Sequence, residues 1–251
     1  MAFEKSMSNV FQQPVCIITG GSSGIGLATA RKFYDAGYRI SICGRSQERL
    51  DKAAKIVSAD NALIDSKRLL TVATDLDDPT QAKAFAQKSL EYFGRIDVLV
   101  NNAGVAPLSP FGAITEDSFE QLININVRSG FYLTQLAWNT MVKQGGGTIV
   151  NISSQSAIDP FVGFSTYGAS KAWLELLTHS LAQEGKDLNI RVCSVRPGAV
   201  ETPMLRGLFP DFPSEQCVSP EAVAEIVWGC VDSPTDYPSG SAFPIVADQP
   251  E

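Results

Sequence analysis

Hydrophobic residues follow two alternating patterns along the chain from about residue 14 onward. Short, nearly continuous apolar runs are typical of strands covered on both faces. Longer segments carry apolar residues at every third or fourth position, as on one side of a helix. Strands are predicted at residues 14–19, 39–43, 68–73, 98–100, 148–153, 190–195 and 242–246. Helices are predicted at residues 25–36, 47–57, 80–93, 117–143, 166–184 and 220–231.

The regular alternation of strands and helices predicts an α/β fold. Strands joined through helices run parallel, with right-handed crossovers. We therefore expect a single domain with a doubly wound, seven-stranded parallel sheet and helices on both faces. Ser46 and Ser219 are predicted helix N-caps, and Pro220 suits the first helical position.

A chain of 251 residues suits one domain. We predict a flexible N-terminal tail at residues 1–13 and the folded domain at residues 14–251. Within that domain, residues 206–219 contain two prolines beside Leu208, Phe209 and Phe212. Loops of this kind often cover ligands, so we interpret this segment as an irregular, apolar substrate lid.

The formal net charge of -7 argues against nucleic acid as a partner, because phosphate binding needs a basic face. It also gives no attraction to anionic membranes, and no apolar run approaches the ~20 residues that span a bilayer. A single histidine, His179, and five cysteines without C-x-x-C spacing argue against a metal site. These cysteines favour a reducing compartment, and we expect a cytoplasmic protein.

A glycine-rich turn, TGGSSGIG at residues 19–26, lies between the first predicted strand and the first predicted helix. Glycine lets a phosphate approach the main chain, and a helix start offers free N–H groups to an anion. This context favours a pyrophosphate-binding turn. The alternative is a Gly/Ser-rich connection without a ligand. The spacing differs from both G-x-G-x-x-G and the Walker A motif.

The second predicted strand ends in Cys43-Gly44-Arg45-Ser46, without the acidic residue that binds the ribose 2′-hydroxyl in NAD-selective sites. Arg45 could pair with a 2′-phosphate instead. This favours NADP(H) over NAD(H). The alternative is that Arg45 is a solvated surface residue.

Tyr167 and Lys171 are four residues apart on a predicted helix and should share one face. A nearby ammonium lowers the pKa of a phenol, which suits tyrosine to proton transfer. Ser154 follows a predicted strand and could reach the same point. Taken alone, a Tyr-x-x-x-Lys pair on a helix is more often an ordinary pair of neighbouring side chains than a catalytic one.

With further short motifs, these residues resemble the short-chain dehydrogenase/reductase family, in its single-domain branch. The motifs occur in the family's order over nearly the whole chain. They are residues 19–26, Asp75-Leu76, Asn101-Asn102-Ala103-Gly104, Asn126 in ININV, Ser154, Tyr167 with Lys171, and Pro197-Gly198 with Thr202. The resemblance implies a Rossmann fold and a nicotinamide-dependent oxidoreductase.

The resemblance implies four catalytic roles. Tyr167 is the general acid of reduction, or the base of oxidation, and Ser154 binds the substrate carbonyl oxygen. Lys171 binds the nicotinamide ribose and lowers the pKa of the tyrosine. Asn126 holds a water in a proton relay to that lysine.

The resemblance also implies a cofactor site that shares Tyr167 and Lys171. Its pyrophosphate and adjacent ribose are expected against Gly20, Ser22, Ser23, Gly24, Ile25 and Gly26. Asp75 and Leu76 flank the adenine, and Asn102 lines the path between the two halves of the cofactor. The nicotinamide is expected near Pro197, Gly198, Val200 and Thr202. Arg45 fits the family's NADP-preferring pattern, with NAD(H) as the alternative.

The family usually forms homodimers or homotetramers through the helix predicted at 117–143 and the helix that carries Tyr167. The apolar residues available there are Phe131, Trp138, Trp173 and Leu177, which could equally face the core. Residues 244–251 lack the glycine pair that often follows the last strand in the family. This leaves a tetramer less well supported than a dimer.

The favoured function is NADPH-dependent reduction of a carbonyl compound to an alcohol. The same residues serve the oxidative direction, so an alcohol dehydrogenase remains an alternative. A dinucleotide-binding sensor without turnover is a third alternative, which the intact Ser, Tyr and Lys set disfavours. A 3-oxoacyl substrate is one family possibility, and the residues do not identify the substrate.

Overall fold

The computed structural model describes residues 13–58 and 67–247. Nearly all of the predicted N-terminal tail, residues 1–13, therefore lies outside the described residues. In the described part, no helix combines the length and the apolar character needed to cross a membrane.

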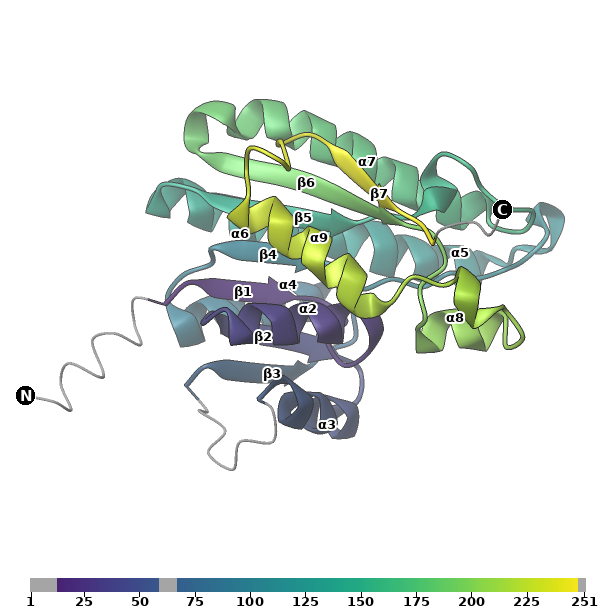
Figure 1. The fold of residues 1–251 in the computed structure, drawn as a ribbon, viewed down its shortest axis with the longest axis horizontal. Helices are drawn as coiled ribbons and strands as arrows, with labels where there is room; N and C mark the ends of the chain where they lie inside the picture. Colours follow the sequence, from purple (N-terminus) through teal and green to yellow (C-terminus); the bar gives the residue numbers. More distant parts are fainter. Residues whose placement is uncertain (1–12, 59–66, 248–251) are drawn as a thin grey trace, which may run out of the picture.

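Seven parallel strands form one sheet in the order β3-β2-β1-β4-β5-β6-β7 (Figure 1). All seven lie at the predicted positions, with ends shifted by at most two residues. The strands are β1 (Val15–Ile18), β2 (Arg39–Gly44), β3 (Leu69–Ala73), β4 (Val98–Asn101), β5 (Gly147–Ile152), β6 (Ile190–Pro197) and β7 (Ala242–Ile245). The predicted doubly wound, seven-stranded parallel sheet is confirmed.

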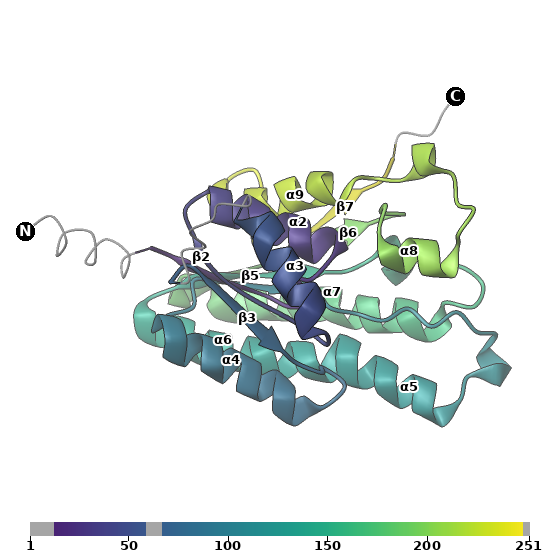
Figure 2. The ribbon, with the colours of Figure 1, turned by 90° about the horizontal axis from the view of Figure 1, so that it is seen from below.

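Helices cover both faces of the sheet and make three layers (Figure 2). One face carries α2 (Gly24–Asp35), α3 (Gln47–Val57) and α9 (Pro220–Asp232). The other carries α4 (Pro79–Phe93), α6 (Ser129–Gln144) and α7 (Ser165–Gly185). Successive strand residues point to opposite layers, which is why the strands are apolar throughout. In β1, Cys16 and Ile18 pack in the first layer, and Val15 and Ile17 in the second.

Side-chain caps start several helices where the sequence predicts them. Ser46 Oγ accepts a hydrogen bond from the Arg49 amide at 3.3 Å, and Ser219 Oγ accepts one from Ala222 at 3.1 Å. Each serine satisfies an amide that has no partner within the helix. Both predicted N-caps are confirmed.

The predicted helix at 117–143 is wrong as a single α-helix. The structure has α5 (Glu116–Leu122), a π-helical turn (Ile123–Arg128) and then α6. Asn126 lies in the π turn, and its side chain exchanges hydrogen bonds with the Val105 backbone at 2.8 and 2.9 Å. The extra residue of a π turn re-aims side chains, and such turns are frequent at functional sites.

The prediction that residues 206–219 are irregular throughout is wrong for the first three residues. They end a short helix, α8 (Pro203–Leu208). Thr202 Oγ1 accepts a hydrogen bond from the Leu205 amide at 3.3 Å, and Pro203 occupies the first turn. This start repeats the pattern of a hydroxyl residue followed by proline at Ser219 and Pro220. The sequence therefore contained a signal for α8.

The strand order reverses between β1 and β4. From β1 the chain builds outward to β2 and β3, and from β4 it builds the other way. The connections after these two strands diverge to opposite faces and leave a crevice at the carboxyl ends. Open α/β sheets bind their ligands at this point.

Candidate active site

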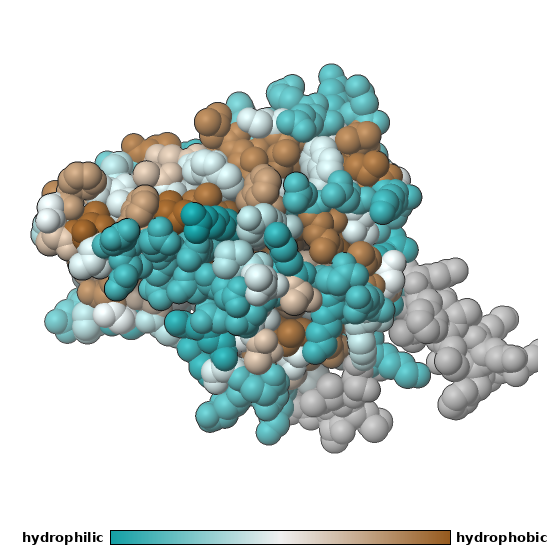
Figure 3. Space-filling view, turned by 180° about the vertical axis from the view of Figure 1, so that it is seen from behind, coloured by the Kyte–Doolittle hydropathy of each residue, from teal (hydrophilic) through white to brown (hydrophobic). Residues whose placement is uncertain are grey.

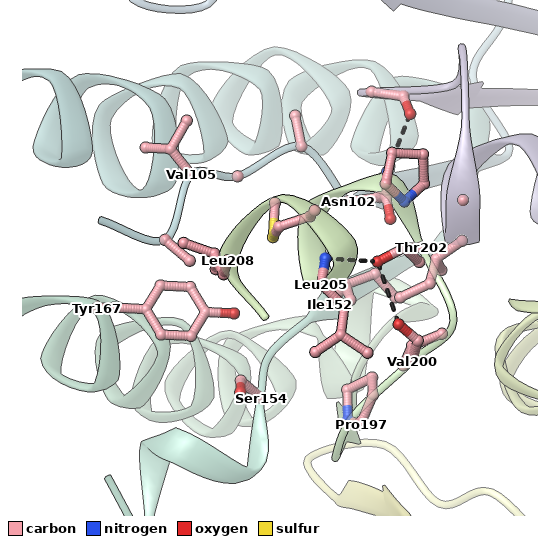
Figure 4. Close-up of a pocket in the computed structure, with 18 of the residues that line it drawn as sticks. Asn102, Val105, Ile152, Ser154, Tyr167, Pro197, Val200, Thr202, Leu205 and Leu208 are labelled. Atoms are coloured by element: carbon pink, nitrogen blue, oxygen red, sulfur yellow. Dashed lines mark hydrogen bonds between the residues drawn. The ribbon is translucent and has the colours of Figure 1, made fainter. Parts of the chain in front are cut away.

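One large cleft, with a volume of about 1010 Å³, lies at the carboxyl ends of the strands. Every predicted site residue lines it except Gly26 and Asn126. Figure 4 shows that Tyr167, Ser154, Asn102 and Thr202 come to it from separate elements. The cleft therefore brings together residues that are more than 100 positions apart in the sequence.

The glycine turn between β1 and α2 is shaped so that side chains would not fit. Gly20 and Gly24 have φ angles of 66° and 53°, a region that L side chains rarely adopt. A Cβ at Gly26 would lie 2.4 Å from the Gly20 carbonyl oxygen, so Gly26 supports the turn from behind. Ser23 is the N-cap of α2 but makes no side-chain cap bond, which leaves the first amides free for an anion.

The turn is fastened to the end of β4 by Asn102 and Thr19. Asn102 Nδ2 donates to the Thr19 carbonyl at 2.8 Å, and Thr19 Oγ1 accepts the amides of Asn102 and Ala103 at 3.0 and 2.9 Å. Asn102 therefore lines the cleft and also holds the two neighbouring strand ends together. Thr19, the first letter of the motif, is a supporting residue that the sequence analysis did not assign.

Two arginines border the cleft beyond β2. Arg45 is exposed there, as its position after the strand predicts. Arg49 Nη2 donates to Ser23 Oγ at 3.1 Å, which links α3 to the glycine turn. The sequence analysis did not name Arg49. This residue lies in the first turn of α3, and its side chain reaches the start of α2.

The hydroxyls of Tyr167 and Ser154 lie close together in the cleft (Figure 4). Burial raises the pKa of Tyr167 above its usual value, and a hydrogen bond with Ser154 acts in the opposite direction. Ser154 Oγ also accepts the Ser156 amide at 3.2 Å. Burial is the larger of these two causes, and the predicted lowering of the Tyr167 pKa by Lys171 stays a prediction.

Lys171 lies beneath the tyrosine and is only 3% exposed. Its Nζ donates to the Ile152 carbonyl at 2.8 Å and lies 5.8 Å from the centre of the Tyr167 ring. Burial lowers the pKa of Lys171 to about 8. The ammonium group is therefore adjacent to the phenol and has two hydrogens left for other partners.

Asn126 lies behind the cleft wall, 2% exposed. Its Nδ2 donates to Ser170 Oγ at 3.0 Å, and Ser170 Oγ donates to the Tyr167 carbonyl at 2.7 Å. A Cβ at Gly104 would lie 3.3 Å from Asn126 Oδ1 and 3.4 Å from Lys171 Nζ. The π turn thus brings Asn126 close to the Lys171 ammonium, with Gly104 between them.

The remaining wall comes from residues 197–202 and the segments that follow. Val200 forms a parallel bridge with Val218, and Thr202 Oγ1 donates to the Val200 carbonyl at 3.2 Å. Leu208, Phe209 and Phe212 of the predicted lid line the cleft, as expected. The sequence analysis did not name several further apolar lining residues, among them Leu108, Phe161, Phe164 and Met204.

Comparisons with known proteins agree with this geometry. Residues 14–212 match the family model for short chain dehydrogenase. The chain is 35% identical to the 3-oxoacyl-[acyl-carrier-protein] reductase FabG of Thermotoga maritima, over 92% of this chain and 95% of the relative. It is 34% identical to a 3alpha-hydroxysteroid dehydrogenase of Mediterraneibacter gnavus, over 94% of this chain and 91% of the relative.

Solved structures give the same result. Levodione reductase superposes with a TM-score of 0.83 at 30% identity, over 93% of this chain and 96% of the other. A 3-ketoacyl-(acyl-carrier-protein) reductase from Brucella melitensis, complexed with NADH, superposes with a TM-score of 0.82 at 26% identity, with the same coverage. The chain therefore belongs to the short-chain dehydrogenase/reductase family, whose members are NAD(P)-dependent oxidoreductases acting on CH–OH and C=O groups.

Proposed function

We propose that the enzyme reduces a ketone or related carbonyl compound to an alcohol with NADPH. The observation that carries the proposal is the convergence of the Tyr167 and Ser154 hydroxyls above the buried Lys171, in the same cleft as the glycine turn. A carbonyl oxygen between these hydroxyls would meet two donors at the atom where negative charge develops. A 3-oxoacyl compound, the substrate type in the name of the Thermotoga relative, is one candidate.

Tyr167 is the proposed general acid. Its hydroxyl is protonated at neutral pH, because burial raises its pKa, so a proton is available for the carbonyl oxygen. Ser154 is the proposed second donor, because its hydroxyl lies within hydrogen-bond reach of Tyr167 and can turn its hydrogen to a substrate oxygen placed between them. Lys171, with two unused hydrogens, is proposed to bind a ribose hydroxyl and to support re-protonation of Tyr167. Asn126 is proposed to extend this relay through a water.

The cofactor would supply the hydride, and the protein residues around it bind and orient it. The glycine turn fits a pyrophosphate, because its positive φ angles and uncapped amides form a cradle that a Cβ would fill. We assign the rest of the cofactor contacts to the cleft residues that the sequence analysis named, from Asp75 and Leu76 at the adenine to Pro197, Gly198, Val200 and Thr202 at the nicotinamide.

The preference for NADPH is supported by two arginines. Arg45 and Arg49 border the end of the cleft where β2 finishes, and Ser23 contacts Arg49. A 2′-phosphate there would meet two cations and no carboxylate from the strand end. The expected outcome is a higher kcat/KM with NADPH than with NADH at equal concentration. The reverse order would assign the enzyme to NAD(H).

The test of the reaction is a substrate screen that follows the loss of NADPH absorbance, with Tyr167→Phe as the matched variant. This change removes one hydroxyl and keeps the ring. We expect kcat to fall by about 10²–10⁴, the usual contribution of a general acid. NADPH affinity should stay close to the wild-type value. Full activity in Tyr167→Phe would rule out the proposed proton donor.

The proposal includes a homodimer in the cytoplasm. Apolar side chains are visible on the face formed by α4, α6 and α7 (Figure 3), where Phe131 is 42% and Leu176 is 70% exposed. Trp138, Trp173 and Leu177 are half-buried on the same helices. Light scattering should give twice the chain mass, and Leu176→Glu should shift it to the monomer. The five unpaired cysteines, four of them buried, support a reducing compartment.

A further inference from the structure

We propose that the substrate is an uncharged carbonyl compound with a bulky, flat apolar body, a fused-ring or aryl ketone, and that no phosphate group contributes to its recognition. This inference rests on the proposed function, since it takes Tyr167 and Ser154 as the groups that hold the reacting carbonyl. It concerns the part of the cleft between those residues and the lid, here called the substrate end.

The first observation is a series of aromatic rings that runs from the proposed acid to the lid. The centre of the Phe164 ring lies 5.3 Å from that of Tyr167 and 6.2 Å from that of Phe209. Phe161 continues the series, 6.3 Å from Phe164. Phe164 is only 6% exposed, so its ring is held in place by packing. A flat apolar substrate would find a preformed aromatic wall beside the reacting carbonyl.

The second observation is the approach of two loops at the opening. Gly163 has a φ angle of 89°, and a Cβ there would lie 2.7 Å from the Leu108 side chain. The Ser109 amide donates to the Gly163 carbonyl at 3.1 Å. This contact holds Leu108, Phe161 and Val162 together around the opening. These three residues are 45%, 65% and 97% exposed, which is unfavourable in water unless an apolar ligand covers them.

The third observation is the distribution of charge along the described lining of the cleft. Its cations are Arg45 and Arg49 beside the glycine turn and Lys171 beneath Tyr167. The polar residues near the lid, Gln155 and Gln216, are uncharged. A substrate carried on a phosphorylated group would therefore find no cation at the described substrate end, and phosphate recognition depends on such contacts.

Arg206, the cation of the lid, is engaged by Glu201 and by other lid residues. Its Nε and Nη2 donate to the two carboxylate oxygens of Glu201. Its Nη1 donates to the carbonyls of Pro210 and Phe212, and Nη2 also donates to Ser214 Oγ. A guanidinium has five N–H donors, and these five bonds occupy all of them. Arg206 therefore organises the aromatic lid and has no donor left for a substrate anion.

The test compares three substrates at saturating NADPH. β-Tetralone is a flat, uncharged bicyclic ketone. Acetoacetyl-CoA carries phosphates, and acetoacetyl-N-acetylcysteamine offers the same 3-oxo thioester without charge. We expect kcat/KM for β-tetralone to exceed both thioesters by about tenfold or more, within the range that apolar pocket contacts supply. The two thioesters should differ little from one another, because the phosphates find no partner.

Variants of the aromatic wall give the second readout. Phe209→Ala should raise KM for β-tetralone by about tenfold and change kcat little, since the lost contact is apolar binding. Phe209→Leu should restore part of the affinity. Phe111→Ala is the matched control, because Phe111 is 76% exposed and lies outside the cleft lining. NADPH affinity of each variant verifies that the fold is intact.

The outcomes separate this inference from the proposed function. A preference for acetoacetyl-CoA over its uncharged analogue by about tenfold would overturn the inference and leave carbonyl reduction standing. An unchanged KM in Phe209→Ala would also overturn it. Turnover that survives Tyr167→Phe would overturn the proposed function alone, and turnover of none of the three substrates would overturn both.

Discussion

The two ends of the cleft are built by different means. At the glycine turn the wall is built from main chain at the glycines and from short side chains, and two arginines supply charge. At the substrate end the wall is made of side chains, mostly aromatic and aliphatic, and the neighbouring Arg206 is paired with Glu201 rather than turned to the cleft. The end at the glycine turn suits a charged ligand, and the substrate end suits an apolar ligand.

The difference teaches where specificity is encoded. A main-chain cradle depends on strand order and on a few glycines, so it changes little when other residues change. A side-chain wall depends on which apolar residues three loops bring together, so substrate choice can shift without disturbing the cofactor site. Tyr167, Ser154 and Lys171 lie where the two ends meet.

The largest effect is expected from a side chain added at Gly26 in the glycine turn. A Cβ at Gly26 would lie 2.4 Å from the Gly20 carbonyl, a main-chain atom that cannot move without reshaping the turn. We expect Gly26→Val to weaken NADPH binding by about 10²-fold, the equivalent of one or two hydrogen bonds to a charged group. Gly207→Ala is the control, since nothing lies within 4 Å of its Cβ position. Fluorescence titration measures the affinity, and unchanged binding would contradict the cradle.

A pH profile of the reaction tests Lys171, which lies where the two ends of the cleft meet. Burial lowers the pKa of Lys171 to about 8, so the ammonium is charged below that pH and neutral above it. Burial raises the pKa of Tyr167, so the acid stays protonated over the same range. We expect kcat for reduction to be level below pH 8 and to fall above it, approaching tenfold per pH unit. In Lys171→Arg the fall should disappear, because arginine keeps its charge.

The cradle end could be predicted from sequence because its signals are local. The strand, the glycine turn and the helix start are neighbours in the chain. The cap residues Ser46 and Ser219 likewise each lie directly before the helix that they cap. The substrate end could not, since Phe164 and Phe209 are 45 positions apart and meet only through the fold. The π turn at Asn126 also escaped prediction, because its helical periodicity is uninterrupted in the sequence.

Opening the lid should affect the substrate end alone. Arg206→Ala removes five hydrogen bonds that hold Glu201, Pro210, Phe212 and Ser214 together. We expect KM for an apolar ketone to rise about five- to tenfold, with NADPH affinity unchanged. Arg206→Lys should recover little, because lysine has three donors and no planar fork. An equal loss of NADPH affinity would show that the lid also serves the cofactor.

The smallest effect is expected at the charged end of the cradle. Arg49 is exposed, so Arg49→Ala removes only a solvated ion pair with the cofactor. We expect kcat/KM for NADPH to fall about threefold. NADH should be unaffected if the guanidinium meets the 2′-phosphate. If both cofactors weaken equally, Arg49 acts through its bond to Ser23 and the shape of the turn. Arg31→Ala is the control, because Arg31 lies on α2 outside the cleft lining. The ratio of kcat/KM for NADPH to kcat/KM for NADH therefore shows whether the Arg49 charge selects the cofactor or supports the shape of the glycine turn.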